Sequence, residues 1–230
     1  MARKAQATNA SRAGTGKGGK YANKRTAVKK SREFPLMPVA VGGILLAFAI
    51  GLIIYIFYNN KPATPPQTVA GVQCDQLEHS KVHYHAALQI VYQGTVHPIP
   101  SNLGIVTDAS GNSSCFYWLH VHAGQSNVIH IEAPASQKFT LGQFFDVWAA
   151  WNKAMGQPQA EPLDATHVST ITLTPDQKLA VYIDLQDGKG PQLYTGDPKA
   201  IELRNHEVIT LEITPPEVTP PPPFTFASGL

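Results

Sequence analysis

Histidines gather in three short runs of the sequence, and in each run polar and apolar residues alternate. Five of the nine histidines lie in these runs, and an acidic residue closes the third. Because alternate side chains of a β-strand point to the same face of a sheet, each run would present its polar members together. Imidazole nitrogens suit copper, zinc, iron and nickel. The runs therefore predict a transition-metal site, with copper or zinc as the expected ion. Its candidate ligands are His83, His85, His120, His122, His130 and Glu132.

The second and third runs predict a β-hairpin that places two imidazoles opposite each other. Strands are expected over Cys115 to His122 and over Val128 to Glu132, with the five residues between them as a loop. If the loop pairs the two strand ends, His120 lies directly opposite His130. Opposed residues of an antiparallel pair have Cβ atoms about 4.5 to 5.5 Å apart, so both side chains could reach one ion. A slip of one residue would remove this arrangement.

The first run, His83 and His85, belongs to another expected strand, Val82 to Tyr92. It completes the site only if that strand lies beside the hairpin or faces it. Glu132 is a candidate ligand, a candidate acceptor that fixes a histidine tautomer, or an acid-base group. Two simpler interpretations stay open. The histidines could be solvated residues on the wet face of a sheet, or a metal-free cluster that responds to pH.

A blue-copper centre does not fit this sequence, because it needs His, Cys and usually Met on one ion. Cys115 has the opposite strand parity to His120 and His122, and Met155 lies beyond the one expected helix. The other four histidines are isolated and are interpreted as structural or surface residues. No catalytic triad and no glycine-rich phosphate loop is evident, so no catalytic residue is predicted.

The elements that must position these residues are mostly strands. The one expected helix of the domain is Phe139 to Asn152, with Thr140 as its N-cap and Gln143 completing a capping box. Later strands are expected at Val168 to Leu173, Leu179 to Leu185 and Glu207 to Ile213. The predicted fold class is mainly β, a sandwich or a partly open barrel with one packed helix, preceded by a single transmembrane α-helix.

The predicted transmembrane helix is the uncharged apolar run of 23 residues from Leu36 to Tyr58. A helix of this length can cross a hydrocarbon core of about 30 Å. Residues 1–34 carry ten Lys and Arg and one acid, whereas the residues after Tyr58 carry eight bases and fifteen acids. Basic flanks stay in the cytoplasm, so the larger C-terminal part is expected outside the cell membrane. The oxidising exterior then favours a disulfide between Cys74 and Cys115.

Five segments follow from these boundaries. They are a disordered basic cytoplasmic arm (1–34), a single-pass membrane helix (35–58), a proline-rich linker (59–70), an extracytoplasmic histidine-rich β domain (71–214) and a proline-rich disordered tail (215–230). The expected partners are membrane lipid, through the apolar helix and the basic arm, and possible subunits of a membrane protein complex. No nucleic acid is expected to bind the folded domain.

Several sequence blocks also resemble those of other proteins. They are His-Tyr-His from His83, Cys-Phe-Tyr-Trp-Leu-His-Val-His from Cys115, Ile-His-Ile-Glu from Ile129 and Phe-Thr-Leu-Gly-Gln-Phe-Phe-Asp-Val-Trp from Phe139. This combination resembles a family of uncharacterised, membrane-anchored, extracytoplasmic bacterial and archaeal proteins with no assigned activity. The resemblance covers roughly residues 74–213, so it supports the domain limits and implies no function.

The predicted function is that of a membrane-anchored extracytoplasmic protein that binds copper or zinc. Its role would be metal handling, or service to a membrane metalloenzyme. Two alternatives stay open. One is a metal-dependent oxidoreductase or hydrolase with Glu132 as its acid-base group. The other is a structural subunit of a membrane complex that binds no metal.

Overall fold

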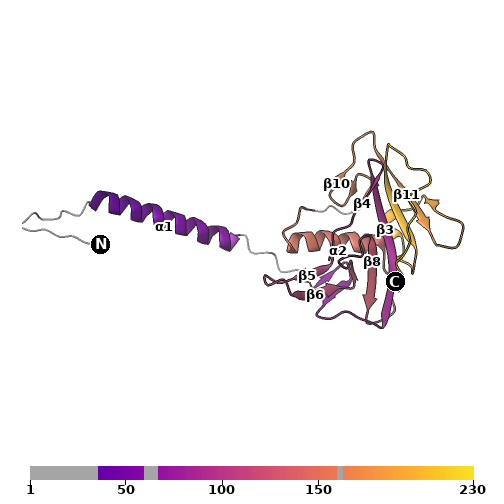
Figure 1. The fold of residues 1–230 in the computed structure, drawn as a ribbon, viewed down its shortest axis with the longest axis horizontal. Coiled ribbons are helices and arrows are strands. Elements are labelled where there is room, and N and C mark those ends of the chain that lie inside the picture. Colours follow the sequence, from indigo (N-terminus) through magenta and orange to yellow (C-terminus); the bar gives the residue numbers. More distant parts are fainter. Residues whose placement is uncertain (1–35, 60–66, 160–162) are drawn as a thin grey trace, which may run out of the picture. The chain divides into compact units, whose positions relative to one another are not determined.

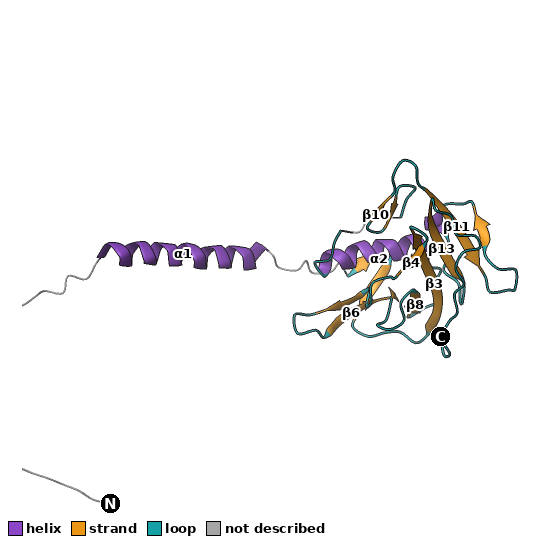
Figure 2. Cartoon of the chain, turned by 45° about the horizontal axis from the view of Figure 1, so that its top comes forward, coloured by secondary structure: helices purple, strands orange, loops and turns teal. Residues whose placement is uncertain are grey.

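The computed structural model describes residues 36–59, 67–159 and 163–230. The chain divides into two compact units, Met1–Ile56 and Phe57–Leu230. The first contains most of helix α1 (Leu36–Asn59), and the second contains all of the strands and helix α2 (Leu141–Ala154), as Figures 1 and 2 show. The predicted basic arm and most of the predicted linker lie outside the described residues.

Helix α1 is 24 residues long and coincides with the apolar run of the sequence. Its side chains are exposed throughout residues 40–56. Among the described residues, none of the helices has the length and apolar character needed to cross a membrane. The structure therefore does not support the membrane span predicted for Leu36 to Tyr58, and the predicted orientation of the chain stays untested.

The larger sheet of the second unit is mixed, with strand order β12-β11-β13-β3-β8-β7 and β4 paired to β3. At its centre, β3 (Val82–Tyr92) runs parallel to β13 (Val208–Thr214), while the other pairs are antiparallel. Alternate side chains of the central strands contribute to one hydrophobic core. The remaining strands are β4 (Thr95–His97), β7 (Leu119–His120), β8 (Val128–Ala133), β11 (Lys178–Asp184) and β12 (Gln192–Tyr194).

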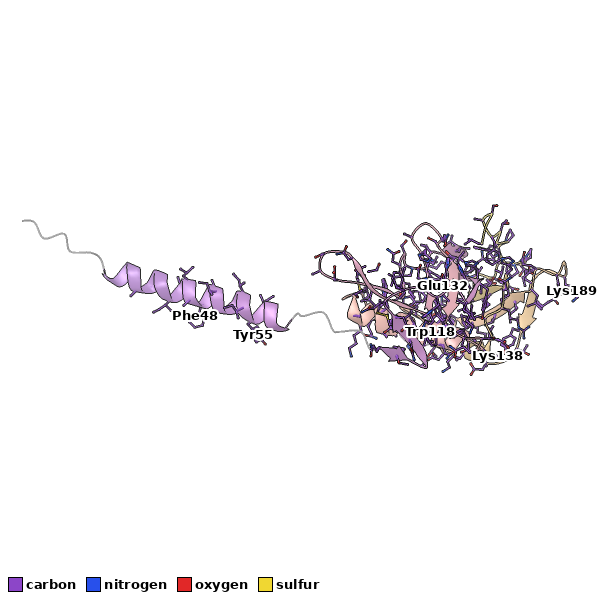
Figure 3. The ribbon with its side chains drawn as sticks, turned by 90° about the horizontal axis from the view of Figure 1, so that it is seen from below. Phe48, Tyr55, Trp118, Glu132, Lys138 and Lys189 are labelled. Carbon is purple, nitrogen blue, oxygen red and sulfur yellow. A yellow bond between two sulfur atoms is a disulfide. The ribbon has the colours of Figure 1, made fainter. Side chains whose placement is uncertain are left out.

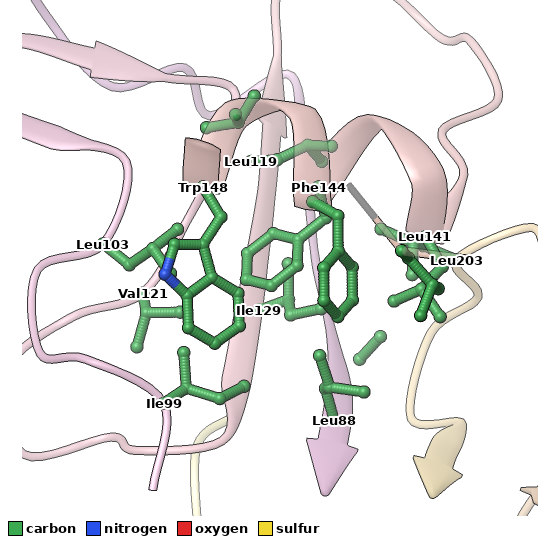
Figure 4. Packing of buried hydrophobic residues seen from close by; sticks show 14 of the residues in the cluster. Leu88, Ile99, Leu103, Leu119, Val121, Ile129, Leu141, Phe144, Trp148 and Leu203 are labelled. Carbon is green, nitrogen blue, oxygen red and sulfur yellow. The ribbon is translucent and has the colours of Figure 1, made fainter. Parts of the chain in front are cut away.

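Helix α2 packs on the hydrophobic face of this sheet. Thr140 caps it as predicted, because its side chain accepts a hydrogen bond from the Gln143 amide while the Gln143 side chain accepts one from the Thr140 amide. Phe144 and Trp148 of α2 lie among Leu88 of β3 and the neighbouring core residues (Figure 4). The sheet's other face is thereby left to the polar members of the same strands.

Smaller sheets flank this core. One has the order β1-β2-β6-β5, and another pairs β9 with β10. Strand β1 pairs with β2, so the folded unit includes residues that the sequence assigns to the end of the linker. The bounds are β1 (Thr68–Val69), β2 (Val72–Asp75), β5 (Ile105–Thr107), β6 (Ser113–Tyr117), β9 (His167–Val168), β10 (Ile171–Thr172) and the 3₁₀-helix η1 (Pro198–Ala200).

Two strands predicted as continuous are interrupted. The stretch Cys115 to His122 splits at Trp118, because β6 pairs with β2 and β5 whereas β7 pairs with β8. The Trp118 amide donates to Gln73 O, and its carbonyl accepts from the Glu132 amide, so this residue links the two sheets. The stretch Val168 to Leu173 folds back on itself at Ser169, which has a positive φ of 55°.

The proline-rich tail predicted to be disordered is packed instead. Its Val218 amide donates to Glu212 Oε1 on β13, and Pro221 is buried. The Phe226 ring lies 4.9 Å from the His206 ring, whose Nε2 donates to Leu230 O at 2.9 Å. Glu212 alternates with core residues of β13, so the tail contacts the side of the sheet away from the core. The tail is ordered because it covers these polar positions of β13.

The predicted mainly β class is confirmed, with α2 as the packed helix, and no sheet of the described residues closes into a barrel. The predicted disulfide between Cys74 and Cys115 is confirmed as well. It joins β2 to β6, the two central strands of the smaller sheet, and links positions 41 residues apart in the sequence. In the chain-entropy model such a loop contributes about 4 kcal/mol to stability.

Candidate metal centre

The three histidine runs lie on adjacent strands of the larger sheet. His120 of β7 is directly paired with His130 of β8, which confirms the predicted hairpin register. His85 of β3 is paired with the same His130 on its other side. Strand β3 thus lies beside the hairpin, so the three imidazoles form a row across the sheet. Ring centroids are 5.6 Å apart for His120 and His130, and 4.4 Å apart for His130 and His85.

A second row lies two residues along the strands, where Glu132 is paired with His83. Glu132 Oε1 is 3.3 Å from His83 Nε2, 3.5 Å from His130 Nδ1 and 3.9 Å from His120 Nε2. His122 follows the end of β7, and its Nε2 is 3.1 Å from His120 Nε2. Figure 3 labels Glu132 within the folded unit, and the side chain is only 6 % exposed. The structure thus brings all six candidate ligands together.

Two groups among these residues could hold a metal ion. One consists of His120, His122, His130 and Glu132, and the other of His83, His85 and His130. In each group one ligand atom per residue lies within 4.8 Å of all the others. These groups share His130, so the cluster is continuous.

Hydrogen bonds fix which ring nitrogens face the cluster. His120 Nδ1 is 2.8 Å from Tyr117 O, and a carbonyl oxygen can only accept, so Nδ1 carries the proton and Nε2 is left with its lone pair. In the same way, His130 Nε2 donates to Gln125 Oε1, which leaves the lone pair on Nδ1. Both lone pairs lie on the Glu132 side of the rings. This is how metal-binding histidines are commonly oriented.

Two buried ring nitrogens of the cluster have no hydrogen-bond partner in the described structure, His85 Nε2 and His130 Nδ1. Leaving a buried polar atom unpaired costs about 1 to 3 kcal/mol. A bound cation would satisfy both atoms, since a neutral imidazole nitrogen donates its lone pair to a metal. The polar interior of the cluster is therefore matched to a ligand that accepts lone pairs.

Burial shifts the protonation of the cluster. It lowers the pKa of His120 to about 4 and, together with the charges of His130 and His83, lowers the pKa of His85 to about 4. The pKa of His122 is also lowered, chiefly by burial. Burial alone would raise the pKa of Glu132, but the neighbouring imidazoles of His130, His120 and His83 outweigh burial and lower that pKa. Near pH 7, His85, His120 and His122 are therefore neutral imidazoles beside a buried carboxylate, as metal coordination requires.

Sequence reasoning missed one carboxylate, Glu78. Its Oε1 is 3.2 Å from His122 Nε2 and 3.6 Å from His120 Nε2. It lies in the loop between β2 and β3, where strand parity makes no prediction. The loop is held by Asp75, whose Oδ2 accepts from Trp118 Nε1 and contacts His79 Nε2, both at 2.7 Å. In the sequence, the only signal for Glu78 is its position five residues before the first His-x-His pair, which begins at His83.

Gly104 gives His120 the space it occupies. Its φ is +80°, and a Cβ at this position would lie 2.6 Å from Leu119 O and 2.9 Å from His120 Cβ. Both distances are shorter than any ordinary contact, so a side chain here would displace β7. The requirement for glycine therefore follows from the tertiary packing of the site.

We expect Gly104→Ala to lower the free energy of unfolding and to weaken metal binding, because β7 must shift. Gly111→Ala is the matched control, since Gly111 has a similar φ of +83° but a Cβ would meet nothing within 4 Å. The backbone strain alone is worth about 1 to 2 kcal/mol in each variant. Denaturant unfolding and metal titration measure the difference. Equal losses of stability and affinity in the two variants would contradict this role of Gly104.

The lowered histidine pKa values predict that the metal-free protein loses stability as pH falls from about 6.5 to about 4. Over this range unfolded histidines bind protons, whereas buried His85 and His120 bind them only near pH 4, so protonation favours unfolding. Thermal melting in the presence of a chelator should show a falling Tm across that window. His85→Gln should flatten the dependence. A Tm that rises on acidification would contradict the lowered pKa values of His85 and His120.

Comparison with protein-family models, curated proteins and solved structures gives no match to this chain. The resemblance of its sequence blocks to membrane-anchored proteins therefore stays a prediction.

Proposed function

We propose that the second unit is a transition-metal-binding domain, with copper or zinc as the bound ion. The observation that carries the proposal is the pair of buried, unpartnered nitrogens, His85 Nε2 and His130 Nδ1, inside a cluster of five imidazoles. Burying these two ring nitrogens without a partner lowers the stability of the metal-free protein. Metal binding gives each of them a partner.

The donor set supports copper or zinc over other ions. Imidazole nitrogens dominate it and carboxylate oxygens complete it, whereas calcium and magnesium prefer sites made of oxygen alone. Thiolate does not contribute, because Cys74 and Cys115 are joined as a disulfide. In a tetrahedral site with bonds of 2.0 to 2.1 Å, donor atoms lie about 3.3 Å apart. The separation of 3.1 Å between His120 Nε2 and His122 Nε2 is close to this value.

Exposure differs across the cluster in a way that suits metal handling. The His120 side chain is 0 % exposed and that of Glu132 is 6 % exposed, so these groups are held rigidly by the sheet. In contrast, the His83 side chain is 44 % exposed and that of His122 is 31 % exposed. An ion could therefore reach the buried donors through solvent-accessible ligands. Metal acquisition, transfer, or service to a membrane metalloenzyme would use such an arrangement.

We expect the purified full chain, without an added histidine tag, to retain copper or zinc after equilibrium dialysis and elemental analysis. Replacing His120, His122 and His130 together with Ala should remove most of that metal, because it removes three imidazoles of one group. His97→Ala serves as the matched control, since His97 lies on β4 and belongs to neither group. An unchanged metal content in the triple variant, folded by circular dichroism, would refute the proposal.

We also propose that the segment Leu36 to Tyr58 attaches the domain to a membrane. Support comes from its 23 uncharged residues and from the exposure of its large apolar side chains, for example Leu46 at 62 % and Phe48 at 75 %. Such surfaces are costly in water. Basic residues before the segment favour a cytoplasmic N-terminus and an extracytoplasmic domain.

Fractionation of bacterial cells that express the full chain tests this attachment. The chain should sediment with membranes and resist extraction by alkaline carbonate. The variant with both Leu46→Arg and Ile53→Arg should be released, because two charges oppose the burial of this apolar segment in lipid. Recovery of the unmodified chain in the soluble fraction would contradict membrane attachment.

A further inference from the structure

The cluster contains more donors than one ion can bind. Five imidazoles and Glu132 belong to the two groups, and Glu78 Oε1 adds a further donor beside His122. A tetrahedral ion takes four ligands. We propose that this site holds two metal ions, one on each side of a shared Glu132 carboxylate. The inference rests on the proposed metal-binding function and deepens it.

The first ion would be bound by Glu78, His120 and His122. Their donor atoms form a triangle with sides of 3.1 Å between the two Nε2 atoms, 3.2 Å from Glu78 Oε1 to His122 Nε2 and 3.6 Å from Glu78 Oε1 to His120 Nε2. These sides bracket the spacing of about 3.3 Å between ligands of a tetrahedral ion. The triangle is therefore already close to one face of a coordination tetrahedron.

The second ion would be bound by His83, His85 and His130. One nitrogen of each lies within 4.8 Å of the other two. The group contains both of the unpartnered buried nitrogens, His85 Nε2 and His130 Nδ1. Neither belongs to the first triangle, so filling that triangle alone would leave them unsatisfied. The cost of those two atoms is the independent reason for a second ion.

His130 decides how the donors divide. It is a member of both groups, but its Nε2 donates to Gln125 Oε1, so only Nδ1 has a lone pair to offer. One lone pair binds one ion. Glu78 completes the first set without His130, and the second set would be reduced to His83 and His85 without it. The arrangement therefore assigns His130 to the second ion.

Glu132 is close to both sets. Its Oε1 is 3.9 Å from His120 Nε2 of the first set, and 3.5 Å from His130 Nδ1 and 3.3 Å from His83 Nε2 of the second. A carboxylate can bind one ion with each oxygen, and paired ions in proteins lie about 3.5 to 4 Å apart. Two divalent ions would also offset the charges of Glu78 and Glu132, with two imidazoles on the first ion and three on the second.

Copper titration of the full, untagged chain tests the inference through stoichiometry and electron paramagnetic resonance. We expect two Cu²⁺ ions per chain and a spin signal well below two per chain, because carboxylate-bridged Cu²⁺ ions couple magnetically. Neither measurement on the unmodified chain depends on the folding of a variant.

Half-site variants then locate the ions. Glu78→Gln with His122→Ala should leave one ion, and so should His83→Ala with His85→Ala, each with a full spin for the remaining copper. His97→Ala should keep two ions and the reduced signal. Two ions retained in both half-site variants would place the metal elsewhere and overturn the inference.

The remaining outcomes separate this inference from the proposed function. A single ion in the unmodified chain, lost when His120, His122 and His130 are replaced, would refute the paired site while the metal-binding function stands. No bound metal in the unmodified chain would refute both. Two ions with two full, uncoupled spins would overturn the shared Glu132 carboxylate.

Discussion

The register of three strands is the constraint on which the candidate site depends. Pairing of His120 with His130, and of His130 with His85, sets the imidazoles in one row across β7, β8 and β3. Because side chains of a strand alternate between faces, a slip of one residue would turn this row into the hydrophobic core and turn core residues outward. The packing of α2 against Leu88 and its neighbours therefore stabilises the register of the site as much as the fold.

The same alternation explains what the sequence predicts well. Polar and apolar residues alternate along β3 and β8, so both strands and the parity of their histidines follow from the pattern. The hairpin register follows because a loop of fixed length leaves few ways to keep both apolar faces on one side. The capping box of α2 is also a local signal, made by Thr140 and Gln143 alone.

What the sequence does not predict depends on contacts between distant residues. Glu78 lies in a loop that Asp75 holds through Trp118, and no periodicity applies there. The strand breaks at Trp118 because the backbone of this residue is hydrogen-bonded to both sheets. Position 104 requires glycine only because β7 lies against it. The tail packs despite its prolines because it covers polar positions of β13, a surface that is not visible until the sheet is assembled.

A metal site on a sheet must balance two opposing demands. Burial lowers the pKa of His85 and His120 and frees their lone pairs, but it also leaves polar atoms that water cannot reach. The metal-free fold carries that cost, offset by the core on the opposite face and by the disulfide between Cys74 and Cys115. In the proposed metal-bound state the ion would supply the missing partners, and ligands that are already oriented would lose little entropy when they coordinate. The rigidity of the sheet, which leaves these buried atoms unpaired in the metal-free protein, is therefore the same property that would favour coordination.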